Sequence, residues 1–367
     1  MIPYLIPLII TLLAAIAFDG KEKMSPIKTA IWAFLFVYLT CLVGLRYEVG
    51  GDTITYMAVY EWARPLSTWE FDLFGMYQPG YTFLCAITKS ISEDFTLFQF
   101  FHAFIINTIL FRFIRKYTKY IFTALFVLEF SIYIYFTTEI LREVLAIAVF
   151  LLNYKNYEQK KWLKYYIGAA LSCLFHFSAI ILFIIPFLNK IRFNKKFIIL
   201  SFVSLGLLYF TGNVMSHLGG SYIIDKFNGY WGGHYGYLVT FLYFLRNAVF
   251  PLFFAWIIKF KFKQELKFEN IICIMILFGI GSAINPLIWG RTVNYFMIFF
   301  CISFGDYCGQ AMKSANKRIH NNAWILLVFF LITYSTYYLS IKNYMRYIPY
   351  CSVMNPHYVE RDNITKR

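Results

Sequence analysis

The feature that most constrains this chain is a series of long apolar runs. Runs of roughly 16 to 22 residues recur along the sequence, the length that a helix needs to cross a hydrocarbon core of ~30 Å. No segment alternates apolar and polar residues with a period of two, as the strands of a membrane barrel do. Only 14% of the residues are charged, whereas soluble domains contain about 25%. The sequence therefore predicts an all-α, polytopic helical membrane protein.

Basic residues gather in short clusters between these apolar runs. Because Lys and Arg next to membrane spans face the cytoplasm, we interpret the formal net charge of +15 as an orientation signal and expect no nucleic-acid partner. The clusters begin at Lys21, Arg112, Lys155, Lys190, Lys259 and Lys313. The segment 46–78 is rich in Asp and Glu instead, and we predict that it lies outside.

With the loops oriented in this way, the sequence predicts about ten crossing helices and two chain ends that lie outside. The helices are expected at 2–18, 29–45, 95–111, 120–136, 140–154, 197–211, 237–258, 270–289, 293–308 and 322–341. We predict a single integral membrane domain over residues 1–367. Its exterior segments 46–94, 212–236 and 342–367 would form a periplasmic cap, with residues 77–92 as an interfacial or re-entrant helix.

Residues 165–188, YYIGAALSCLFHFSAIILFIIPFL, break the alternation of sides because they lie between two basic clusters that both belong to the cytoplasm. Two short half-helices that meet near His176 would restore the rule. Non-helical backbone at membrane depth is tolerated only where it is buried in protein or lines a wet cavity. We therefore predict a re-entrant hairpin that brings His176 into the bundle, where it is either functional or a hydrogen-bonded core residue.

Four arginines are expected in or at the outer ends of helices. Arg46 follows the second helix, Arg142 opens the helix that re-enters from outside, and Arg291 is expected in a short outer turn. Arg246 is expected about nine residues, or ~14 Å, along a helix that begins outside. Ionisable groups in such places are functional-site hypotheses. Guanidinium groups that share one side of the membrane indicate a site for a phosphorylated anion.

Three of these arginines also have a structural interpretation. Arg46 could extend to the lipid headgroups, and Arg142 and Arg246 could form ion pairs. The alternative partners are Glu139 or Glu143 for Arg142, and Asp52 or Glu139 for Arg246.

The segment RYEVGGDTITY, residues 46–56, concentrates charge around two glycines. Gly50 and Gly51 permit backbone conformations and close approaches that other residues avoid. If a helix begins at Asp52, then Asp52 and Tyr56 share one face of it. Asp52 is then a helix N-cap, a catalytic carboxylate, or both.

Six motifs occur in series between residues 44 and 350: GLRYEVGGDTITY, QPGYTFL, LREVLAIAVFLL, LFHFSAIILFIIPF, GRTVNYF and YIPY. In this order and spacing the chain resembles the EpsG-like branch of the Wzy-type O-antigen and exopolysaccharide polymerases. The resemblance implies a glycosyltransferase of the bacterial inner membrane with an active site that faces the periplasm. Its fold would be similar to that of the multi-spanning lipid-sugar transferases that include the O-antigen ligases.

The reaction implied by the resemblance moves a growing glycan from undecaprenyl pyrophosphate to the non-reducing end of another undecaprenyl-pyrophosphate-linked repeat unit. The partners would be this lipid-linked donor and acceptor and the membrane lipids, and a separate chain-length regulator stays open. The alternatives are an O-antigen ligase-like transferase and a transporter or flippase of the lipid-linked oligosaccharide.

Such a reaction needs positive charge at the leaving pyrophosphate and a base for the acceptor hydroxyl. We predict Asp52, His176 and Arg291 as catalytic residues, with Asp52 favoured over His176 as the base. The predicted substrate-binding residues are Arg46, Tyr56, Arg142, Arg246, Asn294 and Tyr295. The cysteines form no C-x-x-C pair and the first exterior loop has no D-x-D motif, so we expect neither a metal nor another cofactor.

Overall fold

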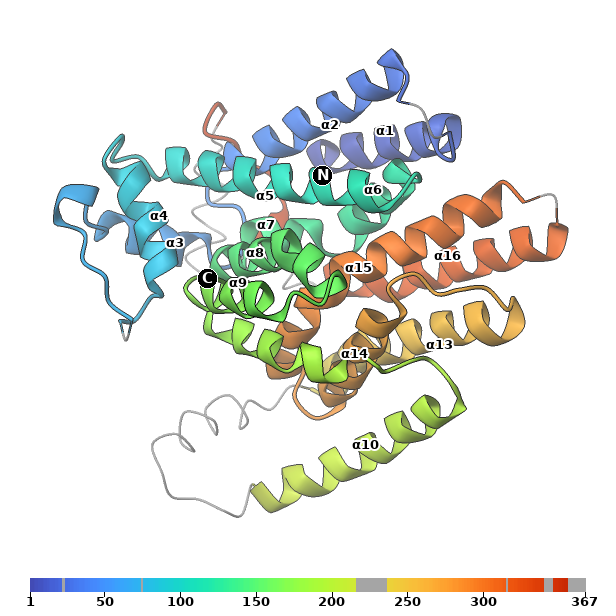
Figure 1. The fold of residues 1–367 in the computed structure, drawn as a ribbon. Coiled ribbons are helices and arrows are strands. Elements are labelled where there is room, and N and C mark those ends of the chain that lie inside the picture. Colours follow the sequence, from blue (N-terminus) through green and yellow to red (C-terminus); the bar gives the residue numbers. More distant parts are fainter. Residues whose placement is uncertain (22–23, 74, 216–235, 315, 340–345, 356–367) are drawn as a thin grey trace.

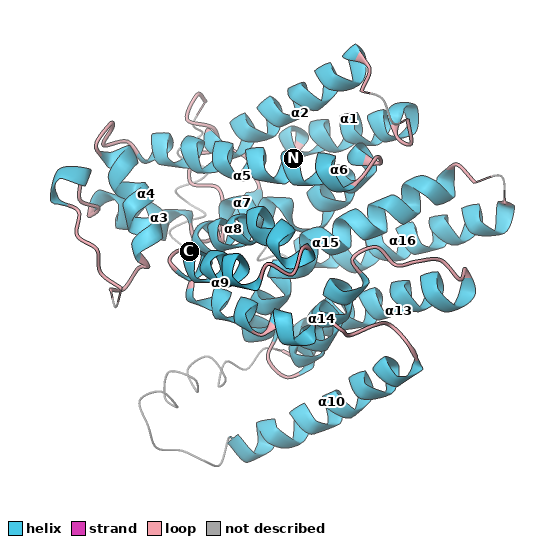
Figure 2. Ribbon diagram, in the orientation of Figure 1, coloured by secondary structure: helices cyan, strands magenta, loops and turns pink. Residues whose placement is uncertain are grey.

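A computed structural model describes residues 1–367 except 22–23, 74, 216–235, 315, 340–345 and 356–367. The described residues form helices and connecting loops, and their β pairing is limited to isolated bridges that involve Ser352 (Figure 2). Several helices, α2, α5, α10, α13, α15 and α16 among them, have axes of similar orientation (Figure 1). The prediction of an all-helical protein is confirmed.

The helices before the hairpin are α1 (Ile2–Phe18), α2 (Pro26–Gly44), α3 (Thr53–Glu61), η1 (Leu66–Thr68), α4 (Pro79–Lys89), α5 (Phe95–Tyr117), α6 (Ile121–Leu128), η2 (Glu129–Tyr133), α7 (Ile134–Thr138) and α8 (Leu141–Glu158). The helices that follow are α9 (Trp162–Cys173), η3 (Phe177–Phe183), η4 (Ile185–Leu188), α10 (Lys195–Met215), α12 (Tyr237–Phe244), η5 (Leu245–Val249), α13 (Phe250–Trp256), η6 (Ile257–Lys261), α14 (Glu269–Ile280), η7 (Gly281–Ala283), α15 (Pro286–Met312) and α16 (Lys317–Leu339). The segments η2, η5 and η6 are π-helical turns within longer helices.

Five helices among the described residues are long and apolar enough to cross a membrane. They are Pro26–Gly44, Phe95–Tyr117, Ile121–Thr138, Tyr237–Lys261 and Pro286–Met312. The chain is therefore a helical membrane protein. Helices occur at all ten places where the sequence predicts a crossing, and the number of crossings itself stays a prediction.

Side-chain caps explain where several of these helices begin. Ser25, directly before the first residue of α2, accepts a hydrogen bond from the Lys28 backbone N–H. Asp94 accepts one from the Thr96 N–H at the start of α5. These contacts satisfy backbone donors that have no partner within the helix.

The boundary predicted between the helices at 270–289 and 293–308 is wrong, and Asn285 explains why. Its side chain accepts hydrogen bonds from the backbone N–H groups of Leu287 and Ile288, and Pro286 occupies the first position of α15. This cap starts the helix well before residue 293. Arg291 therefore lies within α15 and not in a turn between two helices, because an Asn N-cap followed by Pro is a strong helix start.

The predicted break in residues 165–188 is present. The helix α9 ends at Cys173, His176 occupies the N-cap of η3, and η3 packs against α9. A helix of this length spans about 18 Å, less than a hydrocarbon core. The two short helices thus form a hairpin whose tip carries His176.

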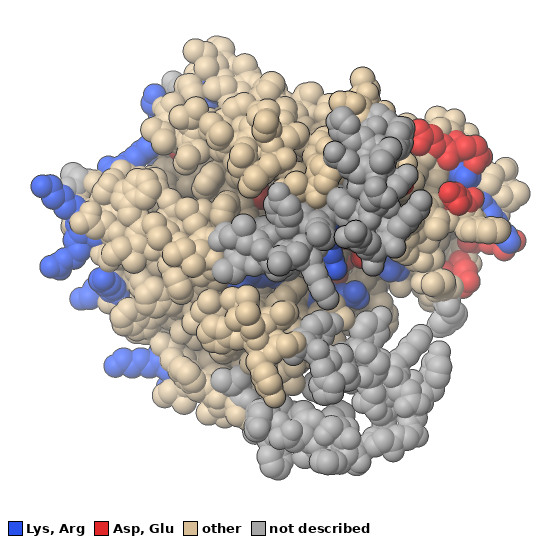
Figure 3. Space-filling model, turned by 180° about the vertical axis from the view of Figure 1, so that it is seen from behind, with Lys and Arg blue, Asp and Glu red and all other residues tan. Residues whose placement is uncertain are grey.

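The helices α3 and α4 lie at one end of the bundle (Figure 1). Acidic side chains gather at this end and basic side chains at the opposite end, with a largely uncharged surface between them (Figure 3). The exposed acidic residues of this region are Asp52, Glu61, Glu70, Asp72, Glu93 and Asp94. This separation is the one that positive-inside orientation produces. Of the predicted exterior segment 212–236, residues 216–235 lie outside the described residues, and a periplasmic cap stays a prediction.

Candidate functional site

Two of the predicted arginines line one small hollow, which we call the arginine hollow. Arg246 and Arg291 face it together with Asn294, and Tyr135 and Tyr243 complete its polar wall. The hollow encloses about 20 Å³, room for a water molecule. Ligand groups larger than water would enter only if side chains moved apart.

Arg246 is placed by the π-helical turn η5, and such turns occur often at functional sites. The side chain is 6% exposed, and its Nε donates to Asn247 at 3.1 Å. The guanidinium lies 4.9 Å from the ring centroid of Tyr243 and 6.0 Å from that of Tyr334. These aromatic faces stabilise the cation in a largely apolar setting.

Arg142 begins α8 and contacts the start of α4. Its Nη1 donates to the Gln78 side chain at 3.1 Å, and its guanidinium lies 4.8 Å from the ring centroid of Tyr77. Burial raises the pKa of Tyr56, and the charge and hydrogen bonding of Arg142 oppose this shift. The Nε of Arg142 is buried and donates to no acceptor among the described residues. Arg142 therefore keeps an unused buried donor next to Tyr56.

The hairpin tip connects His176 to α15 through a chain of hydroxyl groups. The Nδ1 of His176 lies 2.6 Å from the Ser178 Oγ, and this Oγ lies 2.9 Å from the Tyr295 hydroxyl. The backbone N–H of Ser178 donates to the same Nδ1. Because Nδ1 accepts that bond, the neutral ring carries its proton on Nε2. His176 is thereby prepared to donate a hydrogen bond from Nε2.

Glu143 lies next to the arginine hollow. Its Oε1 accepts a hydrogen bond of 2.8 Å from Asn294, which lines the hollow. Arg142 and Arg291 both lie within electrostatic range of Glu143 and of His176. The structure therefore brings Arg142 and Arg291 into one region with two hydrogen-bonded pairs, His176 with Ser178 and Glu143 with Asn294.

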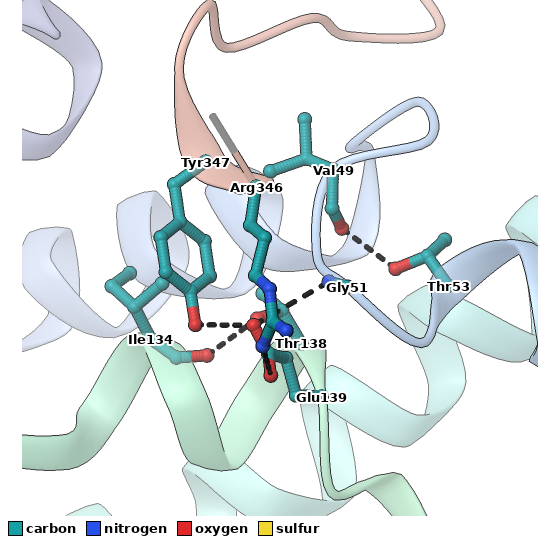
Figure 4. A network of polar contacts seen from close by, with 8 residues as sticks. All are labelled: Val49, Gly51, Thr53, Ile134, Thr138, Glu139, Arg346 and Tyr347. Atoms are coloured by element: carbon teal, nitrogen blue, oxygen red, sulfur yellow. Dashed lines mark hydrogen bonds and ion pairs between the residues drawn. The ribbon is translucent and has the colours of Figure 1, made fainter. Parts of the chain in front are cut away.

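A second polar network lies around Glu139, in the loop between α7 and α8 (Figure 4). Arg346 forms an ion pair of 3.1 Å with Glu139, the Tyr347 hydroxyl donates to the same carboxylate, and the Gly51 N–H lies 3.4 Å from it. The C-terminal segment also pairs with the glycine loop directly, since the Gly50 N–H donates to the Arg346 carbonyl at 2.9 Å. Glu139 thus joins three distant parts of the chain.

Burial raises the pKa of Glu139 above its ordinary value, while the Tyr347 hydrogen bond and the Arg346 charge act in the opposite direction. Asp52 raises it further by charge repulsion. Asp52 itself is exposed, at the N-cap position of α3, and its side chain makes no capping hydrogen bond. A helix does begin directly after Asp52, so the condition under which Asp52 and Tyr56 share one face is met, and the carboxylate is left accessible.

Arg46 is not among the residues that line the arginine hollow. It is 1% exposed, and it donates to the backbone carbonyls of Val43 and Val49 at 2.6 and 3.1 Å. Burial lowers its pKa to about 10. These bonds fix the loop that leads to Gly50 and Gly51, and the role of Arg46 in binding substrate stays a prediction.

Sequence reasoning missed several members of this region. Glu139 entered only as a possible partner for Arg142 or Arg246, and Glu143 only for Arg142, whereas Glu139 pairs with Arg346 and Glu143 binds Asn294. The signal was present, because Glu143 and Tyr347 fall within the motifs LREVLAIAVFLL and YIPY. No cluster of three or more His, Cys, Asp or Glu that could hold a metal occurs among the described residues, and metal independence stays a prediction.

The fold and this region define a helical membrane protein with a polar, arginine-rich site between its helices. The model of the EpsG family matches residues 29–352, and the chain belongs to this family. The resemblance found in the sequence motifs is thereby confirmed. The family is associated with polysaccharide polymerases of the glycosyltransferase type. No curated protein and no solved structure matches the chain significantly.

Proposed function

We propose that the protein is a polysaccharide polymerase of the inner membrane. It transfers a growing glycan from undecaprenyl pyrophosphate to the non-reducing end of a second lipid-linked repeat unit, at the periplasmic face. The observation that carries this proposal is the convergence of Arg246 and Arg291 on one hollow, with Arg142 and Arg291 both near His176. Guanidinium groups from three helices suit a diphosphate, which offers several oxygens to forked donors.

In the proposed step, an acceptor hydroxyl attacks the anomeric carbon of the donor glycan. The new glycosidic bond forms as the bond between that carbon and the pyrophosphate oxygen breaks, and undecaprenyl pyrophosphate departs. The three arginines neutralise the charge that develops on this leaving group. His176 donates a hydrogen bond to it from Nε2, because its Nδ1 is engaged by Ser178.

Asp52 takes the proton of the acceptor hydroxyl. Its carboxylate is exposed and within electrostatic range of Tyr56, which adjoins Arg142. An accessible carboxylate suits a base that must meet an incoming sugar, whereas the bonding of His176 leaves Nε2 a donor role. Tyr56, Asn294 and Tyr295 position the substrate groups around these two residues.

The small volume of the arginine hollow requires that the site opens on binding. Arg291 and Tyr243 are only partly buried, so rotation of their side chains can admit the diphosphate. Return of these side chains around the bound diphosphate would then exclude water from the reaction.

The test is purified protein mixed with lipid-linked repeat units and scored for a ladder of products. We expect Arg291→Ala and Asp52→Ala to abolish the ladder, while Arg318→Ala, which removes an exposed arginine of α16, retains it. A full ladder in both site variants would refute the proposed site. Transfer to a different acceptor without a ladder would indicate a ligase, and movement of the lipid-linked sugar without transfer would indicate a flippase.

A further inference from the structure

A second hollow lies between α3, the loop that follows it, and α4, and we call it the α3–α4 hollow. It encloses about 790 Å³, compared with about 20 Å³ for the arginine hollow. Pockets that bind small molecules commonly have about 300–1,000 Å³. The α3–α4 hollow therefore has room for several sugar rings, which the arginine hollow lacks in this structure.

The lining of the α3–α4 hollow combines aromatic faces with hydrogen-bonding groups. The aromatic residues are Trp62, Trp69, Tyr77 and Tyr81, and the polar ones include Thr55, Arg64, Glu70, Asp72 and Thr82. Sugars present an apolar face of C–H groups and a rim of hydroxyls, and this combination complements both. An apolar wall with a few placed polar groups is the usual composition of a ligand site.

One aromatic wall of this hollow is held in place. The Nε1 of Trp69 donates to the Thr82 hydroxyl at 3.1 Å, and its ring packs against Phe83 with centroids 5.0 Å apart. Trp62, which directly follows the last residue of α3, is 87% exposed. Burying this indole against a ligand would remove a large apolar area from water.

The α3–α4 hollow adjoins the arginine-rich site. Tyr77 lines the hollow, and its ring lies 4.8 Å below the guanidinium of Arg142. Tyr81 also lines it, and its ring centroid lies 6.0 Å from that of Tyr56. A ligand with its diphosphate near Arg142 would therefore have its next groups at the mouth of this hollow.

We propose that the α3–α4 hollow binds the uncharged sugars of the lipid-linked substrate. The inference rests on the proposed function and adds a glycan subsite to it. The lining holds two carboxylates, Glu70 and Asp72, against one guanidinium, Arg64, which forms an ion pair of 3.3 Å with Glu70. This balance does not favour a diphosphate, and burying the carboxylates against a polyprenyl chain would be costly, whereas their oxygens are good acceptors for sugar hydroxyls. The two parts of the substrate thus bind at different places: its anionic group binds at the arginines, and its hydroxyl-rich part binds between α3 and α4.

The test uses the full-length protein in nanodiscs and a free oligosaccharide without pyrophosphate, prepared by partial acid hydrolysis of the polysaccharide of the producing bacterium. Binding is measured by titration calorimetry for the unaltered protein, Trp62→Ala, Trp62→Phe and Trp324→Ala. Trp324 is the matched control, an exposed tryptophan on α16. We expect Trp62→Ala to weaken binding about tenfold, equivalent to about 1.4 kcal/mol, Trp62→Phe to restore most of it, and Trp324→Ala to leave it unchanged.

The inference is overturned if the unaltered protein does not bind the oligosaccharide, or if Trp62→Ala and Trp324→Ala bind it equally. It is also overturned if Trp62→Ala weakens binding of undecaprenyl phosphate in the nanodisc and leaves oligosaccharide binding intact, because the hollow would then hold lipid. Failure of the proposed function would look different. In that case Arg291→Ala would still produce the ladder, whatever the oligosaccharide does.

Discussion

Gly80 allows a close contact between α4 and the hairpin tip, and its replacement by Ala tests whether this contact positions the site. The Gly80 N–H donates to the Leu174 carbonyl at 2.7 Å. A Cβ at residue 80 would lie 2.7 Å from that oxygen and 3.2 Å from the Phe175 ring. Backbone atoms of the hairpin must therefore move away from α4 in Gly80→Ala.

The cost follows from these two effects. Overpacking a tight contact costs about 1–3 kcal/mol, and the lost hydrogen bond contributes about 0.5–1.5 kcal/mol. We expect about 2 kcal/mol or more of weaker docking between α4 and the hairpin, which corresponds to a roughly 30-fold larger population of the undocked form. Because Gln78 and Tyr77 at the start of α4 hold Arg142, ladder formation should fall as well.

The assay is the rate at which Cys85 of native protein reacts with a thiol reagent, followed by mass spectrometry. Cys85 lies on α4 and is 1% exposed, so it reacts only when α4 opens. We expect Gly80→Ala to raise this rate at least tenfold and to leave buried Cys301 of α15 unchanged. The control Gly206→Ala adds a Cβ where nothing lies within 4 Å. Equal Cys85 rates in the two variants would refute the reasoning.

Three further predictions concern the polar networks. Tyr295→Phe removes the hydroxyl next to Ser178. We expect the rate of ladder formation to fall about tenfold, with a change in the free energy of unfolding of about 1 kcal/mol or less. An unchanged rate would exclude this hydroxyl from the reaction. Asn294→Asp replaces the donor to Glu143 by a second carboxylate, so its melting temperature should fall below that of Asn294→Ala; the reverse order would contradict the charge argument. Burial raises the pKa of the Glu139 carboxyl above 4.5 in the folded protein. As the pH rises, this carboxyl therefore loses its proton in the unfolded state before it does so in the folded state. The melting temperature of the unaltered protein minus that of Glu139→Gln should therefore decrease from pH 4.5 toward neutrality, and a difference that increases would show that the pKa is lowered.

The sequence predicted those parts of the fold that depend on local patterns. The break at His176 followed from basic clusters on both sides of one apolar run, because charge fixes the side of the membrane on which each loop lies. The prediction for Arg291 is wrong because Asn285 and Pro286 begin α15 before it, a local signal that overrides the division of this region into two apolar runs.

The contacts that assemble the site could not be predicted in this way. Glu139 and Arg346 are 207 residues apart, and Asn294 and Glu143 are 151 residues apart. Pairs so distant are decided by how the helices pack, and each carboxylate had an arginine much closer in the sequence. The division between the buried, backbone-bound Arg46 and the arginines of the hollow has the same origin, since only tertiary packing determines which donors a loop uses.

The central claim is that the arginine hollow binds a diphosphate, and titration of the purified protein with inorganic pyrophosphate tests it most directly. The account predicts that Arg291→Ala and Arg246→Ala each weaken the affinity at least tenfold, or about 1.4 kcal/mol, while Arg318→Ala binds as tightly as the unaltered protein. Equal affinity in all four proteins would contradict it.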